Sequence, residues 1–221
     1  MLLDPQVGIM VQGITGREAR GMVADMLAYG SRLIAGVTPG KGGQEVQGIP
    51  VYDTVAQLMA QHRPGISVIS VPAAAVLDAA LEAFAHGIEL CLIMSERIPR
   101  LDASRIKSAA RQAGCTVIGP NSLGLIRPGL AKLGTIGGRV DNVQQSFAPG
   151  SVAVLSRSGG MTTEIASFLT RNGIGQSIAV GVGGDAIVGA GFSDLIALLE
   201  EDEATQAVVL YGEPGGVAEE V

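Results

Sequence analysis

Hydrophobic positions along the chain alternate between short strand-like runs and longer helical patterns. Near the start, Val7, Ile9 and Val11 mark an apolar strand that residues 13–16 interrupt with two glycines. From Arg17 the apolar residues recur with helical spacing, which predicts a strand, a glycine turn and a helix. Glycine lets the backbone approach a ligand closely, and the free N–H groups of a helix start favour a phosphate. A plain tight turn has the same pattern, because the third glycine of the dinucleotide fingerprint is missing.

The same alternation continues through the first half of the chain. Thr54 or Asp53 is expected to cap a helix, and Gly87 to end another. Strands that alternate with helices at this spacing indicate a doubly wound parallel sheet, whose ligands bind where the carboxyl ends of the strands converge. The predicted strands are 32–37, 67–71, 90–94 and 116–118 with an edge hairpin in 46–51, and the predicted helices are 54–61, 73–86 and 102–113.

A second α/β unit follows a segment without sustained periodicity. Residues 151–155, 176–182 and 207–211 are predicted strands, and 161–172 and 193–200 are predicted helices. We therefore expect a first domain at 1–124, an irregular linker at 125–150 and a second, partial domain at 151–221. Three parallel strands leave a small open sheet, and another helix is expected to begin near Ala218. The chain is thus interpreted as a fragment, or as a chain that a partner completes.

Composition narrows the class of protein. A length of 221 residues with 47% hydrophobic residues and 32 glycines suits an α/β protein of one large or two small domains. The apolar runs are too short for a membrane span, and the N-terminus lacks the basic region of a signal peptide. A net charge of −6 without a Lys/Arg stripe argues against nucleic acid. Cys91 and Cys115 are too few for a metal cluster or a disulfide framework, and their apolar neighbours indicate buried thiols in a reducing cytoplasm.

Two loops carry candidate chemistry for an anionic ligand. The loop at 38–43 follows the second strand, where an NAD-binding fold carries an acidic residue, but here it holds Lys41. A lysine suits a phosphate, which favours NADP or coenzyme A over NAD, although a solvated surface lysine is the alternative. The turn from Ser156 to Gly160 offers hydroxyls and N–H groups at a helix start. It is interpreted either as a second anion site or as a plain helix cap.

Seven ordered motifs resemble the α subunit of succinyl-CoA synthetase, also called succinate–CoA ligase. They cover essentially the whole chain, up to about two-thirds of a typical member of that family. The resemblance implies a CoA-binding Rossmann-like domain followed by a partial flavodoxin-like domain, both with parallel sheets. The motifs are Gly13-x-Thr-Gly16, the glycine-rich run 36–43, Glu96-x-Ile-Pro99, Gly119-Pro-Asn121, Ser156-Arg-Ser-Gly159, Gly181-x-Gly-Gly-Asp185 and Gly212-Glu213.

The resemblance also implies a reaction, which belongs to the tricarboxylic acid cycle. An acid–thiol ligase joins succinate or a related dicarboxylic acid to CoA through an acyl phosphate and a phosphohistidine. ATP or GTP, with Mg, would be handled by a β subunit that carries an ATP-grasp domain. The family's histidine lies beyond residue 221, so this chain alone is expected to be inactive. The alternative is a non-catalytic CoA-binding regulatory protein. An NAD(P)-dependent oxidoreductase is disfavoured by Lys41 together with the absence of an acidic residue at the end of the second strand.

Site residues follow from the matching motifs. Ser122 stands where the family has cysteine and Thr163 where it has tyrosine, and Arg17 and Glu18 replace smaller or uncharged residues, which leaves the acid substrate open. His62 and His86 are interpreted as surface or cap residues. The implied CoA contacts are Thr15, Gly16, Arg17 and Glu18, with Lys41 near the phosphates and Met94, Ser95 and Glu96 on the adenine side. The phosphate on the histidine would be bound by Ser156, Ser158 and Gly159, the acid would lie near Thr163, and Glu213 would orient the histidine.

Overall fold

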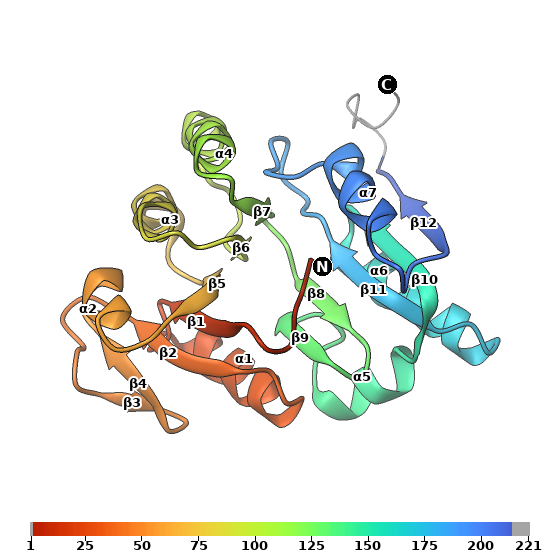
Figure 1. Ribbon diagram of the computed structural model, residues 1–221, viewed down its shortest axis with the longest axis horizontal. Coiled ribbons are helices and arrows are strands. Elements are labelled where there is room, and N and C mark those ends of the chain that lie inside the picture. Colours follow the sequence, from red (N-terminus) through yellow and green to blue (C-terminus); the bar gives the residue numbers. More distant parts are fainter. Residues whose placement is uncertain (1, 214–221) are drawn as a thin grey trace.

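The computed structural model describes residues 2–213 and arranges them as two neighbouring sheets with their helices (Figure 1). The first is a seven-stranded sheet in the order β3-β4-β2-β1-β5-β6-β7. Its strands are β1 (Gly8–Gln12), β2 (Leu33–Val37), β3 (Glu45–Val46), β4 (Ile49–Tyr52), β5 (Pro64–Ile69), β6 (Leu90–Ile93) and β7 (Thr116–Ile118). Its helices are α1 (Arg17–Ala28), α2 (Val55–Met59), α3 (Val76–Ala85) and α4 (Arg100–Ala113), with a 3-10 turn at Ala73–Ala75.

Helices cover both faces of this sheet, as the alternation of apolar residues requires. Ile9 and Val11 belong to the core that α1 shares, whereas Met10 packs in the core beneath α2, α3 and α4. All pairings are parallel except the β3–β4 edge hairpin. Thr54 caps α2, because its hydroxyl accepts a hydrogen bond from Gln57 N at 3.1 Å. The predicted parallel sheet, hairpin and cap are therefore confirmed.

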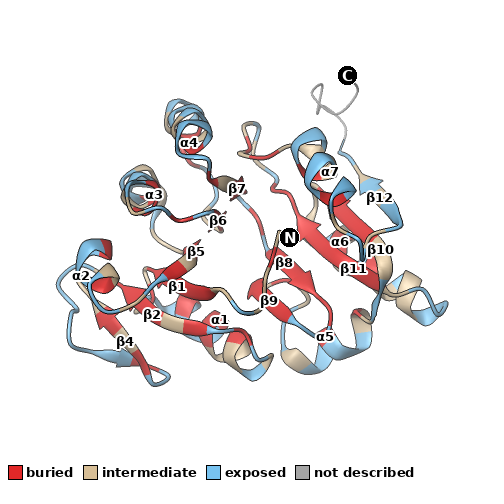
Figure 2. Cartoon of the chain, in the orientation of Figure 1, coloured by how far each residue is buried: buried red, intermediate tan, exposed pale blue. Residues whose placement is uncertain are grey.

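The second sheet has five strands in the order β12-β10-β11-β8-β9. Strands β10, β11 and β12 are parallel, while β8 runs antiparallel to both β11 and β9. The chain segments are β8 (Gly124–Arg127), β9 (Ala131–Gly134), α5 (Val140–Ser146), β10 (Pro149–Ser156), α6 (Gly159–Arg171), β11 (Gln176–Gly181), α7 (Phe192–Glu200) and β12 (Ala207–Tyr211). Strands β8 and β11 and the carboxyl half of β10 are buried, and β12 at the edge is largely exposed (Figure 2). The helix expected near Ala218 lies outside the described residues.

The prediction of an irregular linker at 125–150 is wrong, and so is the three-stranded second sheet. Strands β8 and β9 form a hairpin that adds two strands to the sheet, and Val143 of α5 is fully buried in one core cluster with Ile126 of β8. Its turn runs from Arg127 to Leu130, whose N–H donates to Arg127 O at 3.0 Å. Pro128 and the left-handed Gly129 (φ 78°) occupy the central positions of this turn, as a type II turn requires.

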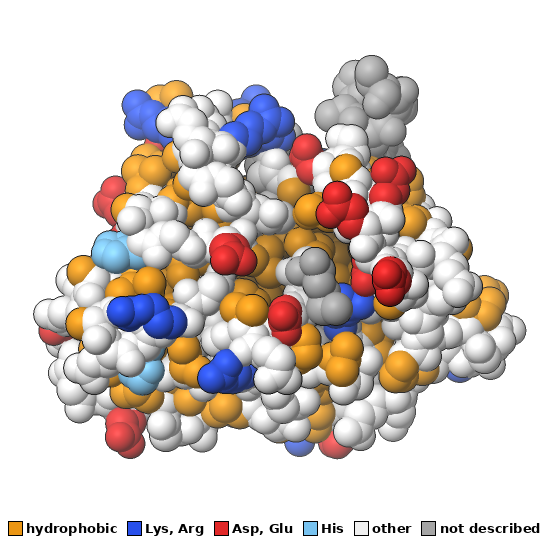
Figure 3. Space-filling view, viewed as in Figure 1, with side chains coloured by type: hydrophobic (Ala, Val, Ile, Leu, Met, Phe, Trp, Pro, Cys, Tyr) orange, Lys and Arg blue, Asp and Glu red, His pale blue; other side chains and the backbone are white. Residues whose placement is uncertain are grey.

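The two sheets meet where the loop after β7 contacts the loop after β11. Gly119 N donates to Val182 O at 2.9 Å, and Gly184 N donates to Asn121 O at 3.0 Å. Both loops follow the carboxyl ends of their strands, so the two ligand-binding edges lie next to each other. On the face seen in Figure 3, basic side chains gather over α4 and acidic ones over α7 and the loop that follows it. The junction therefore lies between surfaces of opposite charge.

The remaining sequence predictions concern cysteines and membrane segments. Cys91 and Cys115 are free and buried, as expected. A hydrogen bond between the two thiols and their burial raise the pKa of Cys91 well above its ordinary value. Among the described residues, the helices include none that combines the length and the apolar character needed to cross a membrane.

Candidate functional site

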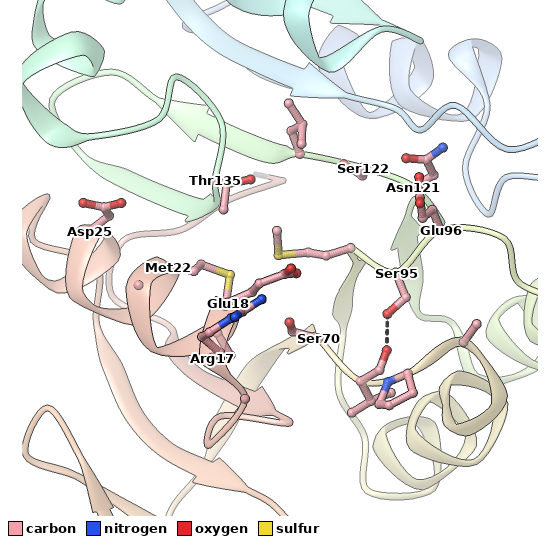
Figure 4. Close-up of a pocket in the computed structure, with 18 residues that line it drawn as sticks. Arg17, Glu18, Met22, Asp25, Ser70, Ser95, Glu96, Asn121, Ser122 and Thr135 are labelled. Atoms are coloured by element: carbon pink, nitrogen blue, oxygen red, sulfur yellow. Dashed lines mark hydrogen bonds between the residues drawn. The ribbon is translucent and has the colours of Figure 1, made fainter.

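A cavity of about 910 Å³ opens at the carboxyl edge of the first sheet, where the two sheets meet (Figure 4). This volume is at the upper end of the range for small-molecule sites. Residues from α1 and from the loops after β5, β6, β7 and β9 form its walls. They are Gly16, Arg17, Glu18, Ala19, Gly21, Met22, Asp25, Ser70, Val71, Pro72, Ala73, Met94, Ser95, Glu96, Asn121, Ser122, Leu123 and Thr135.

The glycine turn presents the start of α1 to this cavity. Gly13 has a φ of 84°, and a Cβ there would lie 2.2 Å from Ser70 O, so only glycine fits between these loops. Gly16 is the N-cap of α1 in extended conformation, without a side chain to satisfy the first N–H groups of the helix. Arg17 and Glu18 are exposed and follow directly. The turn therefore offers unsatisfied N–H donors and a positive helix end at the cavity wall.

The loop after β6 forms the opposite wall. The Ser95 hydroxyl donates to Val71 O, which fixes this loop to the one after β5 (Figure 4). Asn121 N donates to Ser95 O at 2.9 Å, which links the loop to the junction between the sheets. Glu96 is exposed and pairs with Arg97 at 3.4 Å. Hydrogen bonds thus connect the loops after β5, β6 and β7 around one opening, at the sheet edge where the sequence predicted that they converge.

Two predicted CoA contacts lie outside the cavity wall. The Thr15 hydroxyl donates to Thr38 Oγ1 at 3.3 Å, which holds the glycine turn against the loop after β2. Lys41 belongs to that same loop and is exposed, with its backbone N–H donating to Thr38 O at 3.1 Å. Both residues therefore lie beside the start of α1, and their contact with a ligand stays a prediction.

The predicted phosphate-binding residues lie at the carboxyl end of β10. Ser158 caps α6 by accepting a hydrogen bond from Met161 N at 3.4 Å. Ser156 is fully buried, and its hydroxyl donates to Ser158 O at 2.8 Å and accepts from Ser158 N at 3.1 Å. Both hydroxyls thus form hydrogen bonds with backbone atoms of the turn and of the helix start, as the capping interpretation expects. A role for Ser156, Ser158 and Gly159 in binding phosphate stays a prediction.

The other predicted residues of the second domain lie on neighbouring elements. Thr163 is half-buried on α6, and Glu213 is exposed after β12. Because Ser156 pairs with Tyr211 in adjacent parallel strands, Glu213 lies at the same sheet edge as the Ser156 turn. His86 ends α3, with its Nδ1 atom 2.8 Å from Glu82 O, and His62 Nε2 lies 2.9 Å from the Tyr52 hydroxyl.

Sequence reasoning missed several residues of the cavity. Met22 and Asp25 follow Glu18 at spacings of four and seven residues, so they share one face of α1. This helical period was the signal that would have found them. Thr135 was missed because it follows β9, inside the segment interpreted as a linker. Ser70 was missed because the third strand ends at Ile69, earlier than predicted.

The charged side chains of the cavity wall are mostly acidic. Glu18, Asp25 and Glu96 contribute carboxylates, against the single guanidinium of Arg17. Lys132 of β9 is fully buried near the charge of Asp25, and its ammonium group donates to Gly138 O at 2.6 Å. Burial lowers the pKa of Lys132, and the negative charge of Asp25 partly offsets that effect. Burial also raises the pKa of Tyr29, although a hydrogen bond from Gly129 N opposes the change.

Family models match both sheets of the chain. Residues 4–97 match the CoA binding domain, and residues 149–219 match the succinyl-CoA ligase like flavodoxin domain. Subunit alpha 2 of the ADP-forming succinate–CoA ligase of Archaeoglobus fulgidus is 44% identical over 221 residues, which are all of this chain and 75% of that protein. The corresponding alpha subunit of Methanothermobacter thermautotrophicus is 45% identical over 220 residues and is covered to 73%.

Solved structures share the fold at lower identity. ATP citrate lyase from Methanothrix soehngenii, in complex with citrate and coenzyme A, aligns with a TM-score of 0.89 and 24% identity. The alignment covers 98% of this chain but only 37% of that chain. A dinucleotide-forming acetyl-coenzyme A synthetase from Ca. Korarchaeum cryptofilum aligns with a TM-score of 0.72 and 21% identity, covering 95% of this chain and 46% of that chain. At these identities the likeness concerns the fold.

Proposed function

This chain belongs to the succinate–CoA ligase α-subunit family, and we propose that it binds coenzyme A in the cavity between its two sheets. The observation that supports this most directly is the start of α1, which lines the cavity with an N-cap glycine and no capping side chain. Phosphate groups would lie over these N–H donors. The acidic wall beyond them disfavours phosphates, so the neutral pantetheine arm would extend along it toward Asn121 and Leu123.

We further propose that the chain contributes the CoA-binding part of a ligase that makes an acyl-CoA from a dicarboxylic acid. In that reaction a phosphorylated histidine, outside this sequence, would transfer its phosphate to the acid while residues 156–159 bind the phosphate. Glu213 would hold the histidine in orientation, and Thr163 would lie near the acid. A partner subunit with an ATP-grasp domain would supply the phosphate from ATP or GTP with Mg. The chain alone would then bind CoA without turnover.

We predict that Gly16→Asp weakens CoA binding by about tenfold or more, which corresponds to about 1.4 kcal/mol. Aspartate is a good N-cap and its charge suits a helix start. This gain should offset the tight contact of 3.2 Å between the new Cβ and Gly13 O, so the variant should fold about as stably as the original chain. Its carboxylate would nevertheless occupy the position proposed for a CoA phosphate. Titration calorimetry with CoA measures the affinity, and urea unfolding measures the stability.

Arg139→Asp is the matched control for this substitution. Arg139 is the N-cap of α5, has nearly the same backbone angles as Gly16 (φ −67°, ψ 152° against φ −61°, ψ 149°), and likewise makes no side-chain cap. The control changes the net charge by two units instead of one, yet CoA affinity should stay within about twofold. An equal loss in both variants, or no CoA binding by the original chain, would contradict the proposed site.

A further inference from the structure

Leu123 belongs to the wall of the cavity and also touches the second domain. Leu123 is 43% exposed, so part of its surface is free to contact a ligand in the cavity. Gly159, the first residue of α6, packs so closely that a Cβ there would lie 2.4 Å from Leu123 Cγ and Cδ1. One leucine side chain therefore separates the cavity from the turn at residues 156–159.

The backbone on either side of Leu123 is held firmly. The Ser122 hydroxyl donates to Gly181 O and accepts from Gly124 N at 3.0 Å. Leu123 O accepts from Thr135 N at 2.8 Å. Gly124 has a φ of 116°, and a Cβ there would lie 1.9 Å from Leu133 O. The second sheet thus holds the backbone around Leu123, while the Leu123 side chain stays part of the cavity wall.

We propose that Leu123 is a positioning residue that contacts the pantetheine arm of CoA next to its sulfur and directs that sulfur toward residues 156–159. This inference rests on the proposed function. In the transfer step the sulfur would attack the carbonyl carbon of the acyl phosphate, so that a C–S bond forms and the C–O bond to phosphate breaks. The electron pair of that bond and the thiol proton would leave with inorganic phosphate. An apolar contact beside the sulfur would also restrict water, whose attack would give free acid and phosphate.

Leu123→Cys with a CoA disulfide tests where the sulfur lies. The probe is the mixed disulfide of CoA with 2-thiopyridine, and its reference is the corresponding disulfide of glutathione. The introduced thiolate attacks the CoA sulfur, a new S–S bond forms, and 2-thiopyridine leaves as the thione with a proton. For each variant we divide the rate of 2-thiopyridine release with the CoA probe by the rate with the glutathione probe. We expect this ratio to be at least about tenfold higher for Leu123→Cys than for the control Leu130→Cys. Leu130 is 49% exposed in the β8–β9 turn and outside the cavity wall.

A second variant addresses the same contact without covalent chemistry. Leu123→Trp adds bulk where the pantetheine arm would pass, so the affinity for CoA should fall about tenfold. Affinity for 3′-phosphoadenosine 5′-diphosphate, which lacks that arm, should stay within about twofold. If CoA binds the original chain but neither the rate ratio nor this selective loss appears, the role of Leu123 is refuted while the CoA site stands. If CoA does not bind the original chain, the site and the role of Leu123 are both refuted.

Discussion

Replacing Asp202 with alanine is expected to lower the free energy of unfolding by about 3–5 kcal/mol, because the guanidinium of Arg127 would be left buried without its counter-charge. Arg127 Nη2 lies 3.1 and 3.2 Å from the two carboxylate oxygens of Asp202. The side chains are only 4% and 9% exposed. Thr205 donates to the same carboxylate at 3.0 Å, so one side chain connects β8 with the segment before β12. Urea unfolding measures the loss.

The exposed pair of Arg105 and Asp102 provides the control. These groups are 3.6 Å apart on α4, with side-chain exposures of 59% and 24%, so Asp102→Ala should cost less than about 1 kcal/mol. The double variant Arg127→Met with Asp202→Leu should recover most of the lost stability, because no unpaired charge remains. A small loss in Asp202→Ala, or no recovery in the double variant, would contradict this account. Within the described residues Arg127 Nε is buried without a hydrogen-bond partner, which already limits the net gain from the pair.

The pattern of apolar residues was enough to predict the parallel sheets, because a parallel strand that is buried on both faces is apolar at most of its positions. β6 and β11, for example, are buried at every position and were found close to their observed bounds. The β8–β9 hairpin was missed because Arg127 and Lys132 are charged residues in fully buried strands. Partners distant in sequence make these charges tolerable, such as Asp202 for Arg127, and no local pattern reveals them.

The candidate site was predictable only where loops follow strands. The loops before Arg17, after β6 and after β7 were expected at one edge, and the structure brings them together around the cavity. The contact between Leu123 and Gly159 depends on how two domains pack, so no spacing within either domain predicts it. The same holds for Asp25 and Lys132, which are neighbours through packing between α1 and β9.

Lys132→Ala is expected to lower the free energy of unfolding by about 2–5 kcal/mol, the cost of removing a large side chain from a packed interior. Lys132 is fully buried, and its backbone is held by the Ser31 hydroxyl, which donates to Lys132 O at 2.7 Å and accepts from Lys132 N at 3.0 Å. Lys132→Met keeps most of the volume and removes the charge, so it should cost less than about 1.5 kcal/mol. Equal losses in the two variants would show that the ammonium group, with its bond to Gly138 O, matters more than packing.

The pH dependence of the methionine variant distinguishes the charge of Lys132 from its packing. Burial holds the pKa of Lys132 in the folded chain below its ordinary value of 10.5, which applies to the unfolded chain. Between these two values the unfolded chain binds more protons, so the original chain gains stability relative to Lys132→Met as the pH rises. Below the folded pKa both states are protonated, and the difference between the two proteins should not vary with pH. Urea unfolding from pH 7 upward measures the free energy of unfolding of the original chain minus that of Lys132→Met. A value that falls with rising pH would contradict the lowered pKa of Lys132 in the folded chain.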